Sequence, residues 1–229
     1  MKKLIIAITS AFMLFATSAM SMDLRDLRPA VGISGNIGVY AATGIENNFN
    51  DAGTAIDETT KEHGAFATEY GSVFVELGLN DTISVALDYV PQTLETPQND
   101  SNEGPNTKND GSAANENSVK AHIVDLTTLY AKVNLPLGGT YLKVGYSSAT
   151  VQSREVMSSG NNYGDDDTSG PTVGIGYNHE ISDGFSVRAE VTASEFSDVT
   201  TNNGQTNKTE IKVQEMIGAR GTISIVKSF

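Results

Sequence analysis

The chain has 229 residues and a formal net charge of −13, with 28 acidic and 15 basic side chains. This excess of negative charge argues against nucleic acid as a partner, because nucleic-acid binding requires a basic face. The absence of cysteine excludes disulfide frameworks and thiol-based metal or catalytic sites.

The N-terminal segment has the features of a secretory signal. A basic start precedes an apolar run from Leu4 to Ala16, and small residues follow up to Ser21. This pattern is typical of signal peptides, and the run is too short to cross a membrane as a helix. We expect cleavage after Ser21, with Ser18 as the alternative. The predicted division is residues 1–21 as signal peptide, 22–29 as a short periplasmic segment and 30–229 as the folded domain.

The rest of the chain alternates apolar and polar residues with the period of two that is typical of β-strands. From 31 to 41 the odd positions are apolar or small, and the even positions carry Gly, Ser, Asn and Tyr. The pattern recurs over 71–79, 82–89, 128–135, 142–147, 173–178, 185–193 and 217–225. We therefore expect eight strands.

Short and long connections alternate between these strands. The short connections lie at 79–82, 135–139 and 181–184, and the long polar ones at about 44–62, 94–118, 154–170 and 200–207. Outer-membrane barrels have short periplasmic turns and long extracellular loops. The sequence therefore predicts an all-β fold, an eight-stranded antiparallel up-and-down transmembrane β-barrel. A soluble sandwich or lipocalin-like barrel would also alternate, but its water-facing side is usually rich in charge.

The predicted inward face carries seven charged residues: Glu76, Asp88, Lys132, Lys143, Arg188, Glu190 and Arg220. Charges in a narrow lumen must be paired, and side chains can fill an eight-stranded barrel. We therefore expect these residues to form a packed lumen charge network rather than a gated polar passage. Arg188, Arg220 and Lys132 are the expected partners of Glu190.

The C-terminal strand resembles the insertion signal of outer-membrane proteins. The chain ends at Phe229, with Ile225 and Ile223 in step on the same face. The resemblance implies recognition by the assembly machinery as a partner. Lys227 occupies a position that is usually aromatic or apolar in that signal, and we expect it to snorkel at the membrane edge.

Two segments resemble the small opacity-type, OmpA-like and OmpX-like barrels. Gly174–Phe196 resembles their penultimate hairpin, in which a Gly-x-Gly-Tyr strand, a tight turn and an inward Arg-x-Glu follow one another. Gly138–Val151 resembles the preceding strand. The resemblance implies a barrel in the outer membrane of a Gram-negative bacterium, with outer-membrane lipids and lipopolysaccharide as partners. It leaves the role open, because the family has structural, adhesive and defence-related members.

Candidate catalytic and metal-binding residues are few. Some barrels of this kind are lipid A deacylases or proteases, which use histidine near the outer rim. His179 lies beside a short turn at the opposite end, and neither His63 nor His122 has a matching serine and carboxylate in sequence. The run Asp165-Asp166-Asp167 lacks the spacing of a calcium loop. We expect no catalytic residue, no metal site and no cofactor.

The long connections carry most of the net charge and little apolar content. Segment 94–118, rich in Asn, Ser, Gly and Pro, is expected to be disordered. The expected function is that of a monomeric, non-catalytic barrel with a structural or surface-interaction role, such as envelope integrity or adhesion. The alternatives are a narrow porin-like diffusion channel and a lipid-modifying enzyme.

Overall fold

The computed structural model describes residues 27–50, 52–103, 115–156, 163–204 and 209–229. The predicted signal peptide, 1–21, lies outside this part of the chain. No helix in the described residues is long and apolar enough to cross a membrane.

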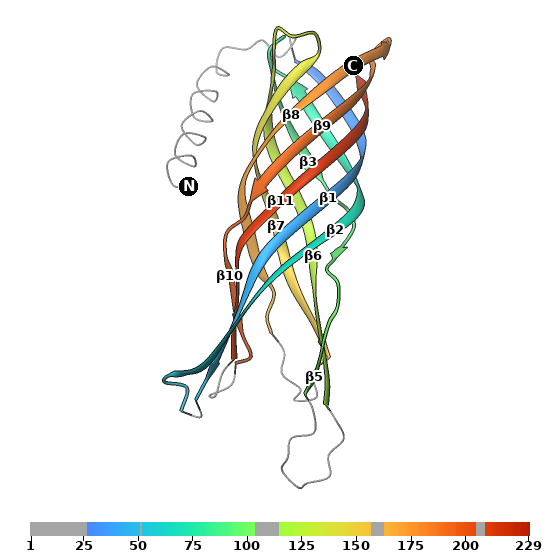
Figure 1. Ribbon diagram of the computed structural model, residues 1–229. Coiled ribbons are helices and arrows are strands. Elements are labelled where there is room, and N and C mark those ends of the chain that lie inside the picture. Colours follow the sequence, from blue (N-terminus) through green and yellow to red (C-terminus); the bar gives the residue numbers. More distant parts are fainter. Residues whose placement is uncertain (1–26, 51, 104–114, 157–162, 205–208) are drawn as a thin grey trace.

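All regular structure in the described residues is β-strand. The strands are β1 (Arg28–Phe49), β2 (Ile56–Gly78), β3 (Ile83–Tyr89), β4 (Leu94–Glu95), β5 (Asn99–Glu103), β6 (Asn115–Asn134), β7 (Thr140–Val156), β8 (Asp166–Ser182), β9 (Phe185–Glu195), β10 (Val199–Asn202) and β11 (Thr209–Ser228). Eight of them form an antiparallel ring in the order β1-β2-β3-β6-β7-β8-β9-β11, which the pairing of β1 with β11 closes (Figure 1). The predicted eight-stranded barrel is therefore confirmed.

Strand alternation separates the two faces of the wall. In β1, Ile33 and Ile37 are 62% and 60% exposed, whereas Ser34 and Asn36 are buried. An apolar outer face and a polar inner face suit a barrel with lipid outside it. The end of the barrel with the short turns is here called the periplasmic end, and the opposite end is called the outer end.

The strands at the outer end are longer than predicted. β1 and β2 remain paired up to Phe49 and Ile56, and the Asn50 amide donates to the Ala55 carbonyl, so the predicted long loop at 44–62 is a β-hairpin. The prediction was wrong because neither face of this hairpin is consistently apolar. Hydrophobic alternation detects a strand only where one face is apolar.

The other predicted long loops also contain strands. β4, β5 and the start of β6 lie within 94–118, β7 ends and β8 begins within 154–170, and β10 (199–202) overlaps the start of 200–207. The expected disorder was therefore wrong for β4, β5 and the start of β6, while residues 104–114 lie outside the described part. At the other end of the domain, β1 begins at Arg28, two residues before the predicted boundary at 30.

Two β-bulges lie near the outer end. Asp125 in β6 and Glu215 in β11 both have a φ of 55°, in the left-handed region that non-glycine residues rarely adopt. The β6–β7 register shifts between Val124 and Thr127, and the β1–β11 register shifts beside Ala41. An extra residue in one strand bends that strand and redirects its side chains, so β6 and β11 bend at these positions.

The wall is incomplete beside β2. β2 pairs with β3 only from Val73 to Gly78. On this edge, residues 56–72 have no strand partner among the described residues, because β4 and β5 pair with β6 instead. Figure 1 shows the β1–β2 hairpin turning away from β5 and β6 at the outer end.

Candidate functional site

Glu76 in β2 is the centre of the lumen charge network. Lys132 in β6 donates to Glu76 Oε1 at 2.5 Å, and Arg188 in β9 donates to both carboxylate oxygens at 2.5 and 3.1 Å. The three side chains are 5–8% exposed. A two-pronged arginine contact is a strong and directional ion pair. One carboxylate therefore ties together three strands across the barrel.

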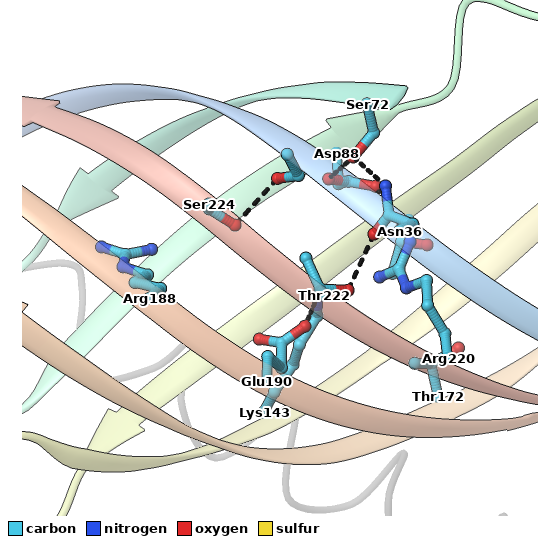
Figure 2. Close-up of polar contacts among 12 residues, drawn as sticks. Asn36, Ser72, Asp88, Lys143, Thr172, Arg188, Glu190, Arg220, Thr222 and Ser224 are labelled. Carbon is cyan, nitrogen blue, oxygen red and sulfur yellow. Dashed lines mark hydrogen bonds and ion pairs between the residues drawn. The ribbon is translucent and has the colours of Figure 1, made fainter. Parts of the chain in front are cut away.

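The remaining carboxylates hold the other two cations. Lys143 Nζ lies 2.9 Å from Glu190 Oε1, and Arg220 Nη1 lies 3.3 Å from Asp88 Oδ1. Ser72 also donates to Asp88, at 2.9 Å. Figure 2 shows these pairs lying among small polar side chains between the strands. The structure thus brings all four cations and three carboxylates of the predicted network into ion pairs.

The predicted partners of Glu190 were wrong. Glu190 pairs with Lys143 and also accepts a hydrogen bond from Tyr141 at 3.0 Å, both from β7. Between β7 and β9, the inward positions of β8 at this level are Gly174 and Gly176. Because these residues have no side chains, the residues of β7 can reach across β8. The predicted partners Arg188 and Lys132 bind Glu76, and Arg220 binds Asp88.

A ladder of small polar residues fills the space around the charges. The alternation predicted small polar residues on this inward face, but it did not predict their partners. The bonds are Ser34–Ser224 (2.9 Å), Asn36–Thr222 (2.7 Å), Thr128–Ser147 (2.8 Å), Ser147–Thr172 (2.6 Å) and Thr172–Ser194 (2.7 Å), and Figure 2 includes several of these residues. Buried polar groups are stable when paired in this way.

An apolar layer lies on the outer side of the network. Tyr70, Val90, Leu94, Leu126 and Ala149 form a buried cluster, and Tyr40, Ile123 and Phe196 pack against it. The hydroxyl groups of Tyr40 and Tyr70 are 2.7 Å apart, which satisfies both polar ends. This layer separates the charged part of the lumen from the outer end.

Beyond this layer lies a cavity of about 460 Å³, here called the outer pocket. Its lining residues are Tyr40, Ala41, Ala42, Glu62, Gly64, Ala65, Phe66, Thr96, Pro97, Gln98, Ala121, Ile123, Leu126, Ala149, Val151, Thr168, Phe196, Val213, Met216 and Ile217. The pocket reaches the opening where the wall is incomplete beside β2, with residues 64–66 on one side of this opening and residues 96–98 on the other. The lining of the outer pocket is mostly apolar, and no local sequence pattern predicts it because its walls come from strands distant in the chain.

His63 forms a polar cluster that the sequence did not predict. Its Nδ1 lies 2.9 Å from the Thr43 hydroxyl, which donates to Glu215 at 2.8 Å. Glu215 is one of the two bulge residues. Thr43 is 2% exposed, and none of the three residues lines the outer pocket.

The other candidate residues are separate from one another. His122 lies 3.7 Å from Glu95, and His179 stacks on Tyr177 near the periplasmic end of β8. The three aspartates of the acidic run have different partners. Asp165 contacts Arg154, Asp166 accepts from the Thr200 amide, and Asp167 accepts from the Thr150 hydroxyl.

The residues of the predicted insertion signal lie on the outside of the barrel. Ile223, Ile225 and Phe229 are 58%, 55% and 74% exposed. Lys227, on the same face, donates to the Asp183 carbonyl at 2.8 Å and lies 4.3 Å from the centre of the Phe185 ring. Its charge is thus held at the edge of the apolar band, beside the last short turn.

These features define a small membrane β-barrel with a filled lumen. The chain matches the family model of the outer membrane protein beta-barrel domain over residues 7–214, and it belongs to that family. Its location is the bacterial outer membrane. No curated protein sequence matches it significantly.

Several solved membrane barrels are similar to this chain to different degrees. OprG from Pseudomonas aeruginosa has a TM-score of 0.56 and 14% identity, with 87% of this chain and 95% of that chain covered. The outer membrane protein AlkL has a TM-score of 0.48 and 13% identity, covering 87% and 90%. The outer membrane protease OmpT from Escherichia coli has a TM-score of 0.39 and 6% identity, covering 87% and 97%. At such identities, the likeness to OprG shows the fold alone.

Proposed function

We propose that this protein is a non-catalytic surface barrel that binds small apolar molecules in its outer pocket. The observation that carries the proposal is a cavity of about 460 Å³ with an apolar lining, placed above a closed lumen. Small-molecule sites typically have volumes of about 300–1,000 Å³, mostly apolar walls and a few polar groups. This proposal makes the expected surface-interaction role more specific and assigns it to the pocket.

The lumen below the outer pocket argues against the narrow-channel alternative. Within the charge network, the cavity lined by Lys143, Arg188 and Glu190 has a volume of about 10 Å³. A cavity needs about 10–15 Å³ to hold one water molecule. A ligand in the outer pocket therefore has no open route to the periplasm through the described part of the barrel, and the gap beside β2 provides a side opening at the outer end.

The arrangement of polar groups argues against the enzyme alternative. Thr43, His63 and Glu215 are hydrogen-bonded, but Thr43 is buried in the wall and does not line the outer pocket. A nucleophile must be within reach of its substrate as well as of its base. Among the described residues, the only ionisable groups on the pocket surface are Glu62 and Tyr40, and the Tyr40 hydroxyl is bonded to Tyr70.

Binding of a neutral fluorescent probe tests the proposal. We expect 2-(1-naphthyl)ethanol to bind the protein in phosphatidylcholine nanodiscs, above the background of empty nanodiscs. Ala121→Phe fills part of the pocket and should weaken binding, whereas Ala189→Phe adds the same group on the outward face and should not. Binding that is absent, or equally affected by both substitutions, would contradict the proposal.

The long outer strands favour a second role in surface interaction. The β1–β2 hairpin extends beyond the apolar band and carries Glu46, Asp57, Glu58 and Glu62. Shortening this hairpin should reduce any attachment of cells to a cationic surface while leaving the protein in the outer membrane. Unchanged attachment of cells carrying the shortened protein would exclude the hairpin as the attachment surface.

A further inference from the structure

Glu62 of β2 is the one charged residue that the described chain contributes to the lining of the outer pocket. We propose that the outer pocket selects apolar ligands that carry a positive charge, with Glu62 as the residue that recognises it. An aromatic body joined to a primary amine represents this class. The inference rests on the proposed binding function and adds the charge of the ligand to it.

Glu62 is free to bind a cation. Within the described part of the chain, no ion pair or hydrogen bond holds its carboxylate. The adjacent Lys61 projects from the opposite face of β2, because successive side chains of a strand alternate. Elsewhere at the outer end, Lys120 is bound to Glu95 at 2.6 Å and Arg154 lies 3.6 Å from Asp165. These cations are therefore engaged by other carboxylates.

The approach to the pocket is also negative. Glu58 lies on the same face of β2 as Glu62, four residues nearer the hairpin turn. Glu46 of β1 lies opposite Thr60, on that same face. Clustered charges of one sign attract ligands of the opposite sign and repel those of the same sign. An apolar carboxylate would thus meet repulsion both at the mouth and at the wall.

The deeper wall suits the apolar part of such a ligand. Tyr40 and Phe66 line the pocket as a stacked pair, with ring centroids 5.5 Å apart. Phe66 follows Glu62 by four residues on the same face, a backbone distance of about 13 Å at the usual rise of a strand. A ligand with its charge at one end and its aromatic body at the other would place these two parts near Glu62 and near the ring pair, respectively.

The test compares three probes of similar size. These are 2-(1-naphthyl)ethylamine, 2-(1-naphthyl)ethanol and 1-naphthylacetate, measured by fluorescence with the full chain in phosphatidylcholine nanodiscs at low salt. We expect the amine to bind about three- to fivefold more tightly than the alcohol, since a partly exposed ion pair contributes at most about this much. The acetate should bind most weakly, and about 0.5 M salt should reduce the differences by screening.

Substitution of Glu62 identifies the recognising group. Glu62→Gln should bring the amine to the affinity of the alcohol without changing binding of the alcohol. The matched control Glu58→Gln should change the preference less than about twofold, because Glu58 does not line the pocket. Heat-dependent gel mobility verifies that each variant is folded.

The outcomes separate this inference from the proposed function. If none of the probes binds, the binding function itself is wrong. If the alcohol binds but the amine binds no more tightly, or if Glu62→Gln retains the preference, the inference about charge is overturned while the pocket remains a binding site.

Discussion

Removal of Glu76 tests whether the lumen charge network holds the barrel together. Glu76→Ala would leave Lys132 and Arg188 facing each other without their shared carboxylate, with both side chains less than 9% exposed. Breaking a buried ion pair by removing one partner costs about 3–5 kcal/mol. Glu76 accepts three hydrogen bonds from two cations, so we expect a loss at the upper end of this range.

The assay is equilibrium unfolding in urea from lipid vesicles, followed by the gel mobility of the folded form. The matched control is Glu58→Ala in the exposed part of β2, where a change within about 0.5 kcal/mol is expected. A second variant, Glu76→Leu combined with Lys132→Leu and Arg188→Met, removes the charges together and should recover most of the loss. A Glu76→Ala protein as stable as Glu58→Ala would show that water reaches the network, and the closed-lumen interpretation would be refuted.

Four further predictions concern the wall, the ion pair at the outer end, a loop deletion and conduction. Gly145→Ala should destabilise the barrel by about 1–3 kcal/mol, because a Cβ there would lie 2.5 Å from the Leu129 carbonyl oxygen. The control Gly35→Ala, on the open outward face, should be nearly neutral in the same urea titration. The Lys120 ammonium lowers the pKa of Glu95, so the ion pair between β4 and β6 is complete at neutral pH and is lost as the pH falls through this lowered pKa. Faster hydrogen exchange at residues 94–95 at low pH should show this weakening, and Lys120→Met should reduce the pH dependence. Deletion of residues 98–114 should leave folding yield and barrel stability almost unchanged, since β3 and β6 pair through residues outside the deleted segment; failure of the shortened chain to insert would contradict this. Planar bilayers should show no steady conductance for the full chain or for this variant, and open-channel currents would contradict that expectation.

The membrane-spanning part of the barrel was predictable because its two faces differ in chemistry. In β1, Ile33 and Ile37 face outward while Ser34 and Asn36 face inward, and a period of two records that difference directly. The outer strands lack this signal. Glu58 and Thr59 point to opposite faces of β2, yet both are polar and exposed, so alternation leaves no trace in the sequence.

The partners within the lumen were less predictable than its members. Inward charges can be recognised strand by strand, but the choice between partners depends on what lies between them. Lys143 reaches Glu190 because Gly174 and Gly176 of β8 leave the intervening space empty. The outer pocket was not predictable either, because it results from the divergence of β2 from β4 and from the bulges, which are properties of the three-dimensional wall.

The net charge of the lumen network is opposite in sign to that of the acidic hairpin at the outer end. The network contains four cations and three carboxylates, so one positive charge is left over beneath the apolar layer. A cation drawn inward by the carboxylates of the outer strands would therefore meet repulsion before it reached the network. The apolar layer, where the dielectric constant is low, would strengthen that repulsion. If the outer pocket binds positively charged molecules as proposed, the same arrangement of charges would oppose their passage through the lumen, and they would enter and leave by the outer end alone.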